Sequence, residues 1–250
     1  MEINKTRKSK PPRILIHGDH GIGKSSLAAA APSPVFIQTE DGLDEIDAEA
    51  FPLASTFDML MGQLVSVYKE KHEYKTLVID SLDWTERLVN EHVCKAGGKD
   101  SISDFGFGAG FQAAYEQFGR VVKALNMIRE ERGMAVILTA HSQIKQYNNP
   151  LGADFDRHQI KLRDKNAELF LEWCDVVAFL RFQTYVKEKK EGFSTITKAT
   201  GGSERVLSCY PSAAFVSKNR YGITNDIEAP SAAEGWENLI KAIKGEKTNG

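Results

Sequence analysis

The chain has 250 residues, 42% of them hydrophobic, and a formal net charge of −2. This length and composition predict one α/β domain with a substantial core, without room for a second full domain. The nearly balanced charge excludes a global basic field for nucleic acid, so any such binding must come from local patches. Three widely spaced cysteines suit neither a disulfide framework nor a zinc site, and no apolar run approaches the length of a membrane span. We therefore expect a cytoplasmic protein without membrane contact.

The first twelve residues predict a basic flexible tail. It carries Lys5, Arg7, Lys8 and Lys10 but lacks the hydrophobic region of a signal peptide. These cations are expected to be solvated, or to add to the binding of a phosphate backbone.

Residues 13–31 predict a strand, a glycine-rich turn and a helix. The turn fits G-x-x-x-x-G-K-[ST], the phosphate-binding P-loop, and an incidental glycine-rich turn is the alternative. Glycines let backbone N–H groups converge on an anion, and the helix adds its positive N-terminal end. Lys24 is expected to reach the β- and γ-phosphates, and the Ser25 hydroxyl to bind Mg²⁺. The expected nucleotide-binding residues are Gly18, Asp19, His20, Gly21, Ile22, Gly23, Lys24, Ser25 and Ser26.

Residues 35–38 predict a second strand, which leads directly to Glu40. A carboxylate at the carboxyl end of a strand beside the P-loop strand points into the crevice where α/β ligands bind. Glu40 is therefore the candidate for polarising the attacking water, with decoration of a turn as the alternative. Residues 56–68 then predict an amphipathic helix.

Residues 74–81 predict a buried strand that ends in the acidic residue Asp80. This is the Walker B pattern, in which the carboxylate holds the Mg²⁺ shell from the strand end. Together with Ser25, Asp80 forms the expected metal site. Ser81 is expected either to help position water or to cap the following helix over residues 82–95.

Residues 96–110 interleave glycines with aromatic residues and predict a mobile loop. Phe105 and Phe107 could stack on the bases of single-stranded DNA, or they could pin the loop to the domain body. Both readings stay open at this point.

Residues 111–132 predict a long helix, and residues 134–140 predict a buried strand followed by His141 and Gln143. A hydrogen-bonding residue at such a strand end can sense the γ-phosphate and report hydrolysis to the next segment. A structural role is the alternative.

That next segment, residues 145–165, predicts a long, irregular and modestly basic loop. Long irregular segments in compact domains are usually functional or disordered. It is the first choice for a nucleic-acid contact, with a solvated excursion as the alternative. The expected DNA-binding residues are Lys145, Arg157, Lys161 and Arg163, together with Phe105 and Phe107.

The C-terminal part of the chain predicts short elements. They are a helix over 166–174, a strand over 175–182, a hairpin around the charged turn 187–192, a final strand over 214–217 and a helix that opens with a capping box at Ser231 and ends near residue 243. Residues 244–250 predict a flexible tail.

Lys218 and Arg220 leave the final strand at alternate positions and so point the same way. In a ring or filament they could reach a neighbouring subunit's nucleotide and stabilise transition-state charge, as an arginine finger does. A solvated strand end is the alternative.

Three segments resemble a known family. Residues 37–44 resemble the strand of RecA-type recombinases that carries the catalytic glutamate, which implies that role for Glu40. Residues 140–144 resemble the sensor strand of RecA and of DnaB-like helicases, and imply Gln143 rather than His141 as the sensor. Residues 175–177 and 218–222 are similar to DnaB-like and KaiC-like cores, in which the lysine and arginine act on the adjacent subunit's nucleotide.

The resemblance covers residues 12–243 and is closest to phage-encoded RecA-like ATPases that consist of the core alone, some of them single-strand annealing proteins. It implies a RecA-like P-loop NTPase fold over residues 13–243: a twisted, mainly parallel sheet flanked by helices, with antiparallel strands at the C-terminal side. It further implies an ATP- and Mg²⁺-dependent ATPase that binds single-stranded DNA and promotes annealing or strand exchange as a homo-oligomer in the host cell cytoplasm. A single-stranded DNA-binding protein is a further candidate partner. The alternatives are a hexameric helicase-like motor or loader, and a KaiC-like regulatory ATPase without DNA binding.

Overall fold

The computed structural model describes residues 10–191 and 194–246, with only the backbone described for residues 184–191 and 194–201. In this part of the chain a ten-stranded sheet has the order β10-β8-β7-β1-β5-β4-β2-β3, with β6 paired to β5 and β9 to β7. The strands are β1 Arg13–Gly18, β2 Pro34–Gln38, β3 Glu49–Ala50, β4 Thr76–Asp80, β5 Ala135–Tyr147, β6 Phe155–Ile160, β7 Val176–Glu191, β8 Ser194–Ser208, β9 Lys218–Asn219 and β10 Ile227–Glu228. The α-helices are α1 Lys24–Ala29, α2 Phe57–Lys69, α3 Leu82–Gly97, α4 Ala109–Glu131, α5 Asp164–Trp173 and α6 Ala232–Lys244.

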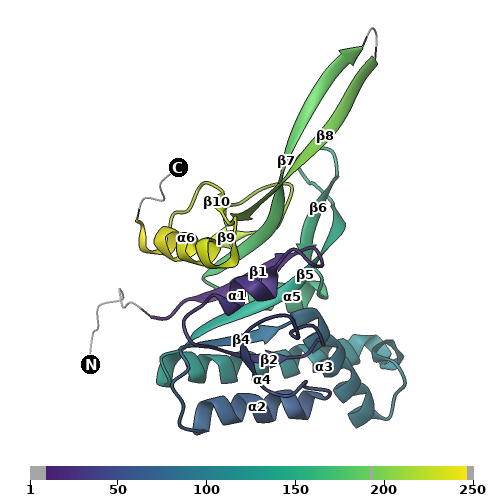
Figure 1. Cartoon of the computed structure of the whole chain (residues 1–250). Helices are drawn as coiled ribbons and strands as arrows, with labels where there is room; N and C mark the ends of the chain where they lie inside the picture. The colour runs from purple at the N-terminus through teal and green to yellow at the C-terminus, as the bar shows by residue number, and fades with distance from the viewer. Residues whose placement is uncertain (1–9, 192–193, 247–250) are drawn as a thin grey trace, which may run out of the picture.

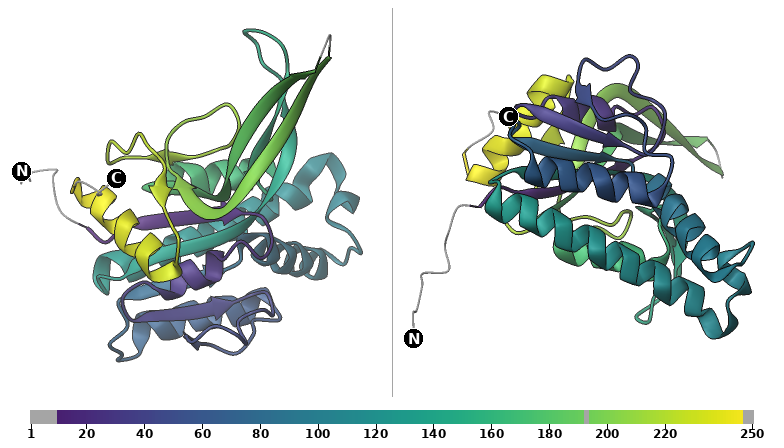
Figure 2. Two further views of the ribbon diagram at one scale, coloured as in Figure 1. Left: turned by 45° about the horizontal axis from the view of Figure 1, so that its top comes forward. Right: turned by 90° about the horizontal axis from the view of Figure 1, so that it is seen from below.

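The centre of the sheet is parallel and is buried on both faces. Strands β7, β1, β5, β4, β2 and β3 pair in parallel. Alternate residues of these strands enter two different hydrophobic clusters: Leu15 packs with α2, α3 and α4, whereas Ile14 and Ile16 pack with α1 and α6. Figures 1 and 2 show these two groups of helices on opposite faces of the sheet. Burial on both faces explains why the strands read as continuous apolar runs.

The antiparallel strands lie at the C-terminal side, as the sequence predicts. β8 pairs antiparallel with β7 and with β10, and β9 pairs antiparallel with β7. The β7/β8 hairpin is much longer than the predicted one and projects from the sheet (Figure 1). The predicted charged turn was placed too early, because residues 187–191 still belong to β7. The predicted fold class, a P-loop NTPase fold with a mainly parallel sheet, is confirmed.

The helix boundaries follow local capping chemistry. Thr56 accepts a hydrogen bond from the Met59 N–H at the start of α2, and Ser231 accepts one from the Glu234 N–H at the start of α6. The segment over 96–110 is more ordered than predicted, because it contains two short 3₁₀ turns, Ile102–Asp104 and Gly106–Gly108.

Two other predictions about elements were wrong. Residues 145–165 are not an irregular loop, because β5 runs on to Tyr147 and pairs with β6 as an antiparallel hairpin. Residues 214–217 are not a strand, since Phe215 makes only an isolated bridge to His158 and the paired residues are Lys218 and Asn219. The apolar alternation of the sequence is too weak in both places to reveal the pairing.

No helix in the described part of the chain is both long enough and apolar enough to cross a bilayer. The predicted tails 1–12 and 244–250 fall largely outside the described residues, although α6 includes Lys244 and the side chain of Lys10 bonds to Glu130.

Candidate nucleotide-binding site

The P-loop connects β1 to α1 at the carboxyl edge of the parallel strands. Gly23 has a φ of 99°, a left-handed conformation that glycine adopts without strain. A Cβ atom at Gly18 would lie 2.4 Å from the Leu180 carbonyl oxygen, so no larger residue fits beside β7. The turn therefore requires its glycines for reasons of conformation and space.

Lys24 is the first residue of α1, and its side chain is turned back over the loop. Its Nζ donates hydrogen bonds to the carbonyl oxygens of Asp19, at 2.8 Å, and Gly18, at 3.2 Å. Burial lowers the pKa of Lys24, and the nearby carboxylates, with Asp80 foremost, counter that effect. The ammonium group is thus held in a site where an added anion would improve its charge balance.

Glu40 and Asp80 follow neighbouring strands and are tied together through the backbone. The Thr39 N–H donates to the Asp80 carbonyl at 2.7 Å, and the Thr39 hydroxyl bonds to both the carbonyl and the N–H of Ser81. The Ser81 hydroxyl donates to Glu40 at 3.2 Å. These bonds fix the two carboxylates at one edge, as the sequence predicts for a water-polarising base and a metal ligand.

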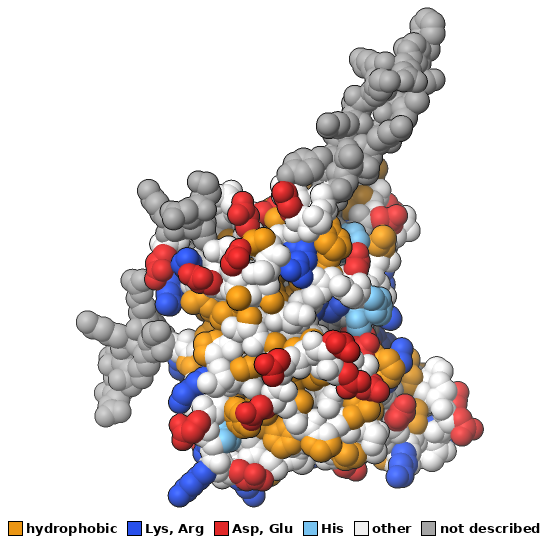
Figure 3. Space-filling model, viewed as in Figure 1, with side chains coloured by type: hydrophobic (Ala, Val, Ile, Leu, Met, Phe, Trp, Pro, Cys, Tyr) orange, Lys and Arg blue, Asp and Glu red, His pale blue; other side chains and the backbone are white. Residues whose placement is uncertain are grey.

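His141 lies beside these carboxylates and is held by Asp83. Its backbone N–H and its Nδ1 bond to the two carboxylate oxygens of Asp83 at 3.0 and 2.9 Å. Burial would raise the pKa of Asp83, but the hydrogen bonds from His141 outweigh it and lower this pKa to about 2. The His141 ring also stacks on His20 of the P-loop, with centroids 3.7 Å apart. In Figure 3, histidine side chains on this face border acidic ones.

These groups surround a cavity of about 370 Å³. Its lining residues are His20, Gly21, Gly23, Lys24, Ser25, Ser26, Glu40, Gly42, Glu45, Ile46, Asp80 and His141. Of the predicted P-loop residues, Gly18 and Asp19 instead supply carbonyls to Lys24, and Ile22 enters the core.

The residues of the cavity fit a magnesium-bound nucleoside triphosphate. Ser25 and Asp80 offer one hydroxyl and one carboxylate oxygen. Thr139 donates to Asp80 Oδ1 at 2.5 Å and so orients that carboxylate. Within the described residues no group of three or more His, Cys, Asp or Glu side chains could hold a metal ion. In nucleotide sites Mg²⁺ is bound by one or two protein ligands together with substrate phosphates, and Ser25 and Asp80 would be those ligands here.

A family model for the AAA domain matches residues 10–221. The chain belongs to the AAA domain family. The matched region includes the P-loop, Glu40, Asp80 and His141, and the family is one of P-loop ATPases. The AAA domain is also 28% identical over 133 residues to the SPbeta prophage-derived uncharacterized protein YorG of Bacillus subtilis (strain 168). That match covers 52% of this chain and 40% of YorG, so the chain aligns with less than half of the relative's length.

Gln143 of the AAA domain does not line the nucleotide cavity. It faces a second hollow of about 380 Å³, here called the basic groove, and its Nε2 donates to the Ile160 carbonyl at 3.3 Å. The lining residues of the basic groove are Asp83, Glu86, Arg87, Asn90, Gln143, Lys145, Lys161, Leu162 and Arg163. The Asp83–His141 pair separates the two cavities, because His141 lines the nucleotide cavity and Asp83 lines the basic groove.

The predicted DNA-binding residues divide into two groups. Lys145, Lys161 and Arg163 meet at the basic groove, and Arg157 lies directly opposite Lys145 in the β5/β6 hairpin. Phe105 packs against the core beside Gly97 and Gly110, which agrees with the structural alternative. Phe107 is fully exposed at a φ of 54° and remains a candidate.

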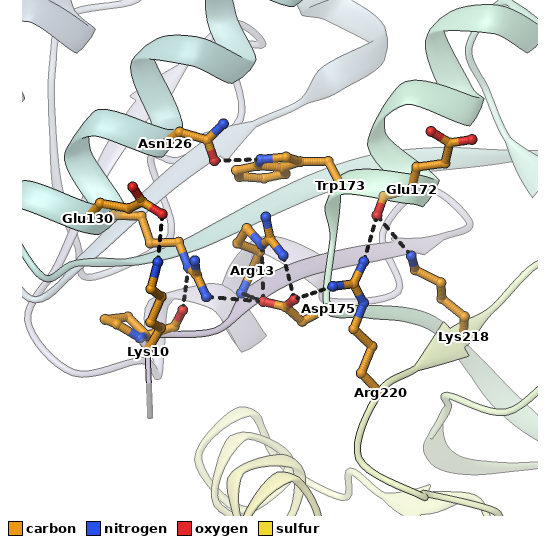
Figure 4. A network of polar contacts seen from close by, with 11 residues as sticks. Lys10, Arg13, Asn126, Glu130, Glu172, Trp173, Asp175, Lys218 and Arg220 are labelled. Carbon is orange, nitrogen blue, oxygen red and sulfur yellow. Dashed lines mark hydrogen bonds and ion pairs between the residues drawn. The ribbon is translucent and has the colours of Figure 1, made fainter. Parts of the chain in front are cut away.

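Lys218 and Arg220 lie at the opposite edge of the sheet from the P-loop. Both donate to the Glu172 carbonyl, at 3.2 and 3.1 Å, and Arg220 is 3.5 Å from Asp175 (Figure 4). Lys218 pairs with Val177 of β7, and Val177 pairs with Leu15 of β1. Leu15 lies three residues before Gly18, the first residue of the P-loop. At about 3.3 Å per residue, this is roughly 10 Å along the strand from the P-loop. Neither side chain serves this subunit's own nucleotide site in the described arrangement.

Two further residues of the site have little or no signal in the sequence. Asp83 could have been suspected as an acid in the first turn of a helix after the Walker B strand. Arg205, from β8, had no signal, because it is 182 residues from Gly23 in the chain. Its guanidinium donates to the carbonyls of Ile22, at 3.3 Å, and Pro230, at 3.1 Å, and braces the P-loop from outside.

Proposed function

We propose that this chain is a phage-encoded ATPase that binds single-stranded DNA in the basic groove and promotes annealing or strand exchange as a homo-oligomer. ATP and Mg²⁺ are the ligands of the P-loop cavity. The observation that carries the proposal is the wall shared by the nucleotide cavity and the basic groove, formed by His141 and Asp83. The phage origin is supported by the similarity to the prophage-derived YorG.

The basic groove has the side chains that a sugar–phosphate backbone requires. Lys161 and Arg163 are exposed, and so is Arg87, whose guanidinium lies 4.1 Å above the Trp84 ring. The acidic residue Glu86 is already engaged, because it accepts hydrogen bonds from the Arg163 N–H and the Asn166 amide. The free cations of the groove thus outnumber its free acids, and phosphate contacts supply most of the sequence-independent affinity for nucleic acid.

The β5/β6 hairpin adds aromatic surface beside these cations. Its register places Gln143, Lys145 and Tyr147 opposite Gln159, Arg157 and Phe155, so all six side chains lie on one face. The Arg157 guanidinium is 4.8 Å from the Tyr147 ring centroid, and the Tyr147 and Phe155 rings are 5.2 Å apart. Aromatic and cationic side chains on one face are suited to stacking unpaired bases without sequence preference.

The hairpin, rather than a disordered loop, would then carry the response to nucleotide. Its stem begins at Ser142, directly after His141, and the Lys161 N–H donates to the His141 carbonyl at 2.8 Å. A shift of His141 on nucleotide binding would therefore move both ends of the stem. ATP is expected to raise DNA affinity by changing the hairpin's position against α3.

The test is fluorescence anisotropy of a labelled oligonucleotide at several salt concentrations, with and without a non-hydrolysable ATP analogue. We expect the analogue to tighten binding about tenfold, which corresponds to about 1.4 kcal/mol. The double variant Lys161→Glu/Arg163→Glu should weaken binding and flatten the salt dependence by about 0.7 per lost phosphate contact. The matched control is Lys75→Glu, which reverses an exposed charge at the other edge of the sheet.

Equal DNA affinity with and without the analogue would remove the coupling. No DNA binding at all would favour a regulatory ATPase that acts on protein partners. A defined hexamer whose hydrolysis is stimulated by tailed duplex would favour a helicase-like motor or loader.

A further inference from the structure

Asp83 makes two hydrogen bonds that determine how the His141 ring is oriented. One carboxylate oxygen accepts the His141 backbone N–H and the other accepts Nδ1–H. The Asp83 side chain is 6% exposed and the His141 side chain 7%. A carboxylate held in this way fixes both the plane of the ring and the nitrogen that faces away from it.

The His141 side chain also borders the nucleotide cavity. His141 lines that cavity together with Lys24 and Glu40, and one of its faces is covered by His20. Among the side chains that the structure describes, none hydrogen bonds to Nε2 of His141. This nitrogen is the ring atom that remains for a ligand.

We propose that Asp83 is a positioning residue for the terminal phosphate of the nucleotide, acting by directing Nε2 of His141 towards it. The inference rests on the proposed function for the occupancy of the cavity by a nucleoside triphosphate. With Nδ1–H given to the carboxylate, Nε2 is the ring nitrogen left to meet a phosphate oxygen, to which it can bond only as an N–H donor. The pair would therefore distinguish a triphosphate from a diphosphate. Gln143 is not placed for this task, because it faces the basic groove.

The test uses the stereochemistry of two amide replacements at position 141. The amide of His141→Asn stands where Nδ1 stood, so it keeps the bond to Asp83 but offers no donor at Nε2. The amide of His141→Gln stands near Nε2, so it keeps a donor for the phosphate. Asp83→Asn retains the size of the side chain but has only one accepting oxygen, so it cannot accept from both N–H groups of His141. Asp58→Asn is the matched control, because Asp58 faces another imidazole, that of His92 at 3.7 Å, on the outside of α2.

The measurement is the affinity of the intact chain for a non-hydrolysable ATP analogue and for ADP, by displacement of a fluorescent nucleotide in the absence of DNA. The wild type should prefer the triphosphate. His141→Asn should lose about tenfold to a hundredfold of this preference, as expected for a hydrogen bond to a charged group. Asp83→Asn should lose about threefold to tenfold, His141→Gln should lose less than His141→Asn, and Asp58→Asn should match the wild type.

The double variant Asp83→Asn/His141→Asn separates positioning from a structural role. If Asp83 acts through His141, the double variant should lose no more preference than His141→Asn alone. Additive losses, or an unchanged preference in Asp83→Asn, would overturn the inference while nucleotide binding stands. A wild type that binds neither nucleotide would overturn the proposed function and this inference together.

Discussion

Polar side chains have different roles at the two edges of the parallel sheet. At the carboxyl edge Lys24, Glu40 and His141 face a cavity. At the amino edge Asp175 is surrounded by Arg13, at 2.6 Å, and by the guanidinium groups of Arg129 and Arg220, each at 3.5 Å (Figure 4). The carboxyl edge, here called the open edge, leaves hydrogen-bonding groups for a ligand. The amino edge, here called the closed edge, uses them to hold the domain together.

The pKa values of the two edges reflect this difference. Burial would raise the pKa of Asp175, but the hydrogen bonds and charge of Arg13, with the charge of Arg129, hold it below its ordinary value. Lys24 has the reverse balance, since burial lowers its pKa and its neighbours only partly compensate. A site that binds an anion needs such a deficit of negative charge, whereas a structural network does not.

The largest effect is expected for Lys24→Ala at the open edge. It removes the cation nearest the phosphates, so ATP hydrolysis should fall below detection in a phosphate-release assay. Lys75→Ala, an exposed lysine at the closed edge, is the control and should be unaffected. Hydrolysis within tenfold of the wild type in a folded Lys24→Ala would contradict this assignment of the open edge.

Arg220→Ala tests whether the closed edge is only structural. The resemblance to RecA-like cores predicts that Arg220 acts on a neighbouring subunit's nucleotide, and the loss in kcat is then about 10³-fold. Mixing Arg220→Ala with Lys24→Ala should restore part of the activity, because some interfaces then combine an intact P-loop with an intact arginine. If Arg220→Ala is less stable but hydrolyses ATP normally, the residue belongs to the structural network alone.

Asp175→Asn should separate stability from function at the closed edge. Leaving three guanidinium groups around a neutral amide is expected to cost about 3 kcal/mol of unfolding free energy. Urea denaturation should show this loss, while affinity for a fluorescent ATP analogue stays the same. The depressed pKa gives the pH dependence its sign: this contribution is present above the ordinary carboxyl pKa and is lost as the pH falls through the folded value. A change in nucleotide affinity instead would mean that the edges are coupled.

A pH-dependent effect is expected at His17, which contacts Ser142 at the base of the β5/β6 hairpin. Its Nε2 donates to the Val216 carbonyl at 2.7 Å, so its Nδ1 accepts from Ser142 at 2.9 Å. Burial lowers the pKa of His17 from 6.5 to about 4. The unfolded chain thus binds a proton between these values while the folded chain does not, and stability falls with falling pH by up to about 3 kcal/mol.

The His17→Gln variant lacks this titration but retains a donor for Val216. Its urea midpoint should change less than that of the wild type between pH 7 and pH 4.5. Parallel pH profiles for the two proteins would show that the base of the hairpin is accessible to solvent, as the open edge is, and is not part of the core.

The nucleotide cavity could be predicted because its parts are local in sequence. The P-loop is one strand–turn–helix unit. Asp80 ends β4 and Glu40 lies two residues after β2, so parallel pairing of these strands brings both to the same edge. For the basic groove, the sequence predicts the residue types but not their arrangement. Lys145, Lys161 and Arg163 stand out in the sequence as basic residues, but their meeting depends on the pairing of β5 with β6 and on the position of α3.

By itself, the sequence determined the phosphate-binding turn, the buried parallel strands and the chemistry at their ends, because each depends on residues close together in the chain. Only the tertiary structure decided that Asp83 holds His141, that Arg205 braces the P-loop and that Lys218 and Arg220 face away from it. These contacts join residues between 46 and 183 positions apart. Their geometry is set by how strands pair and helices pack, which no local pattern specifies.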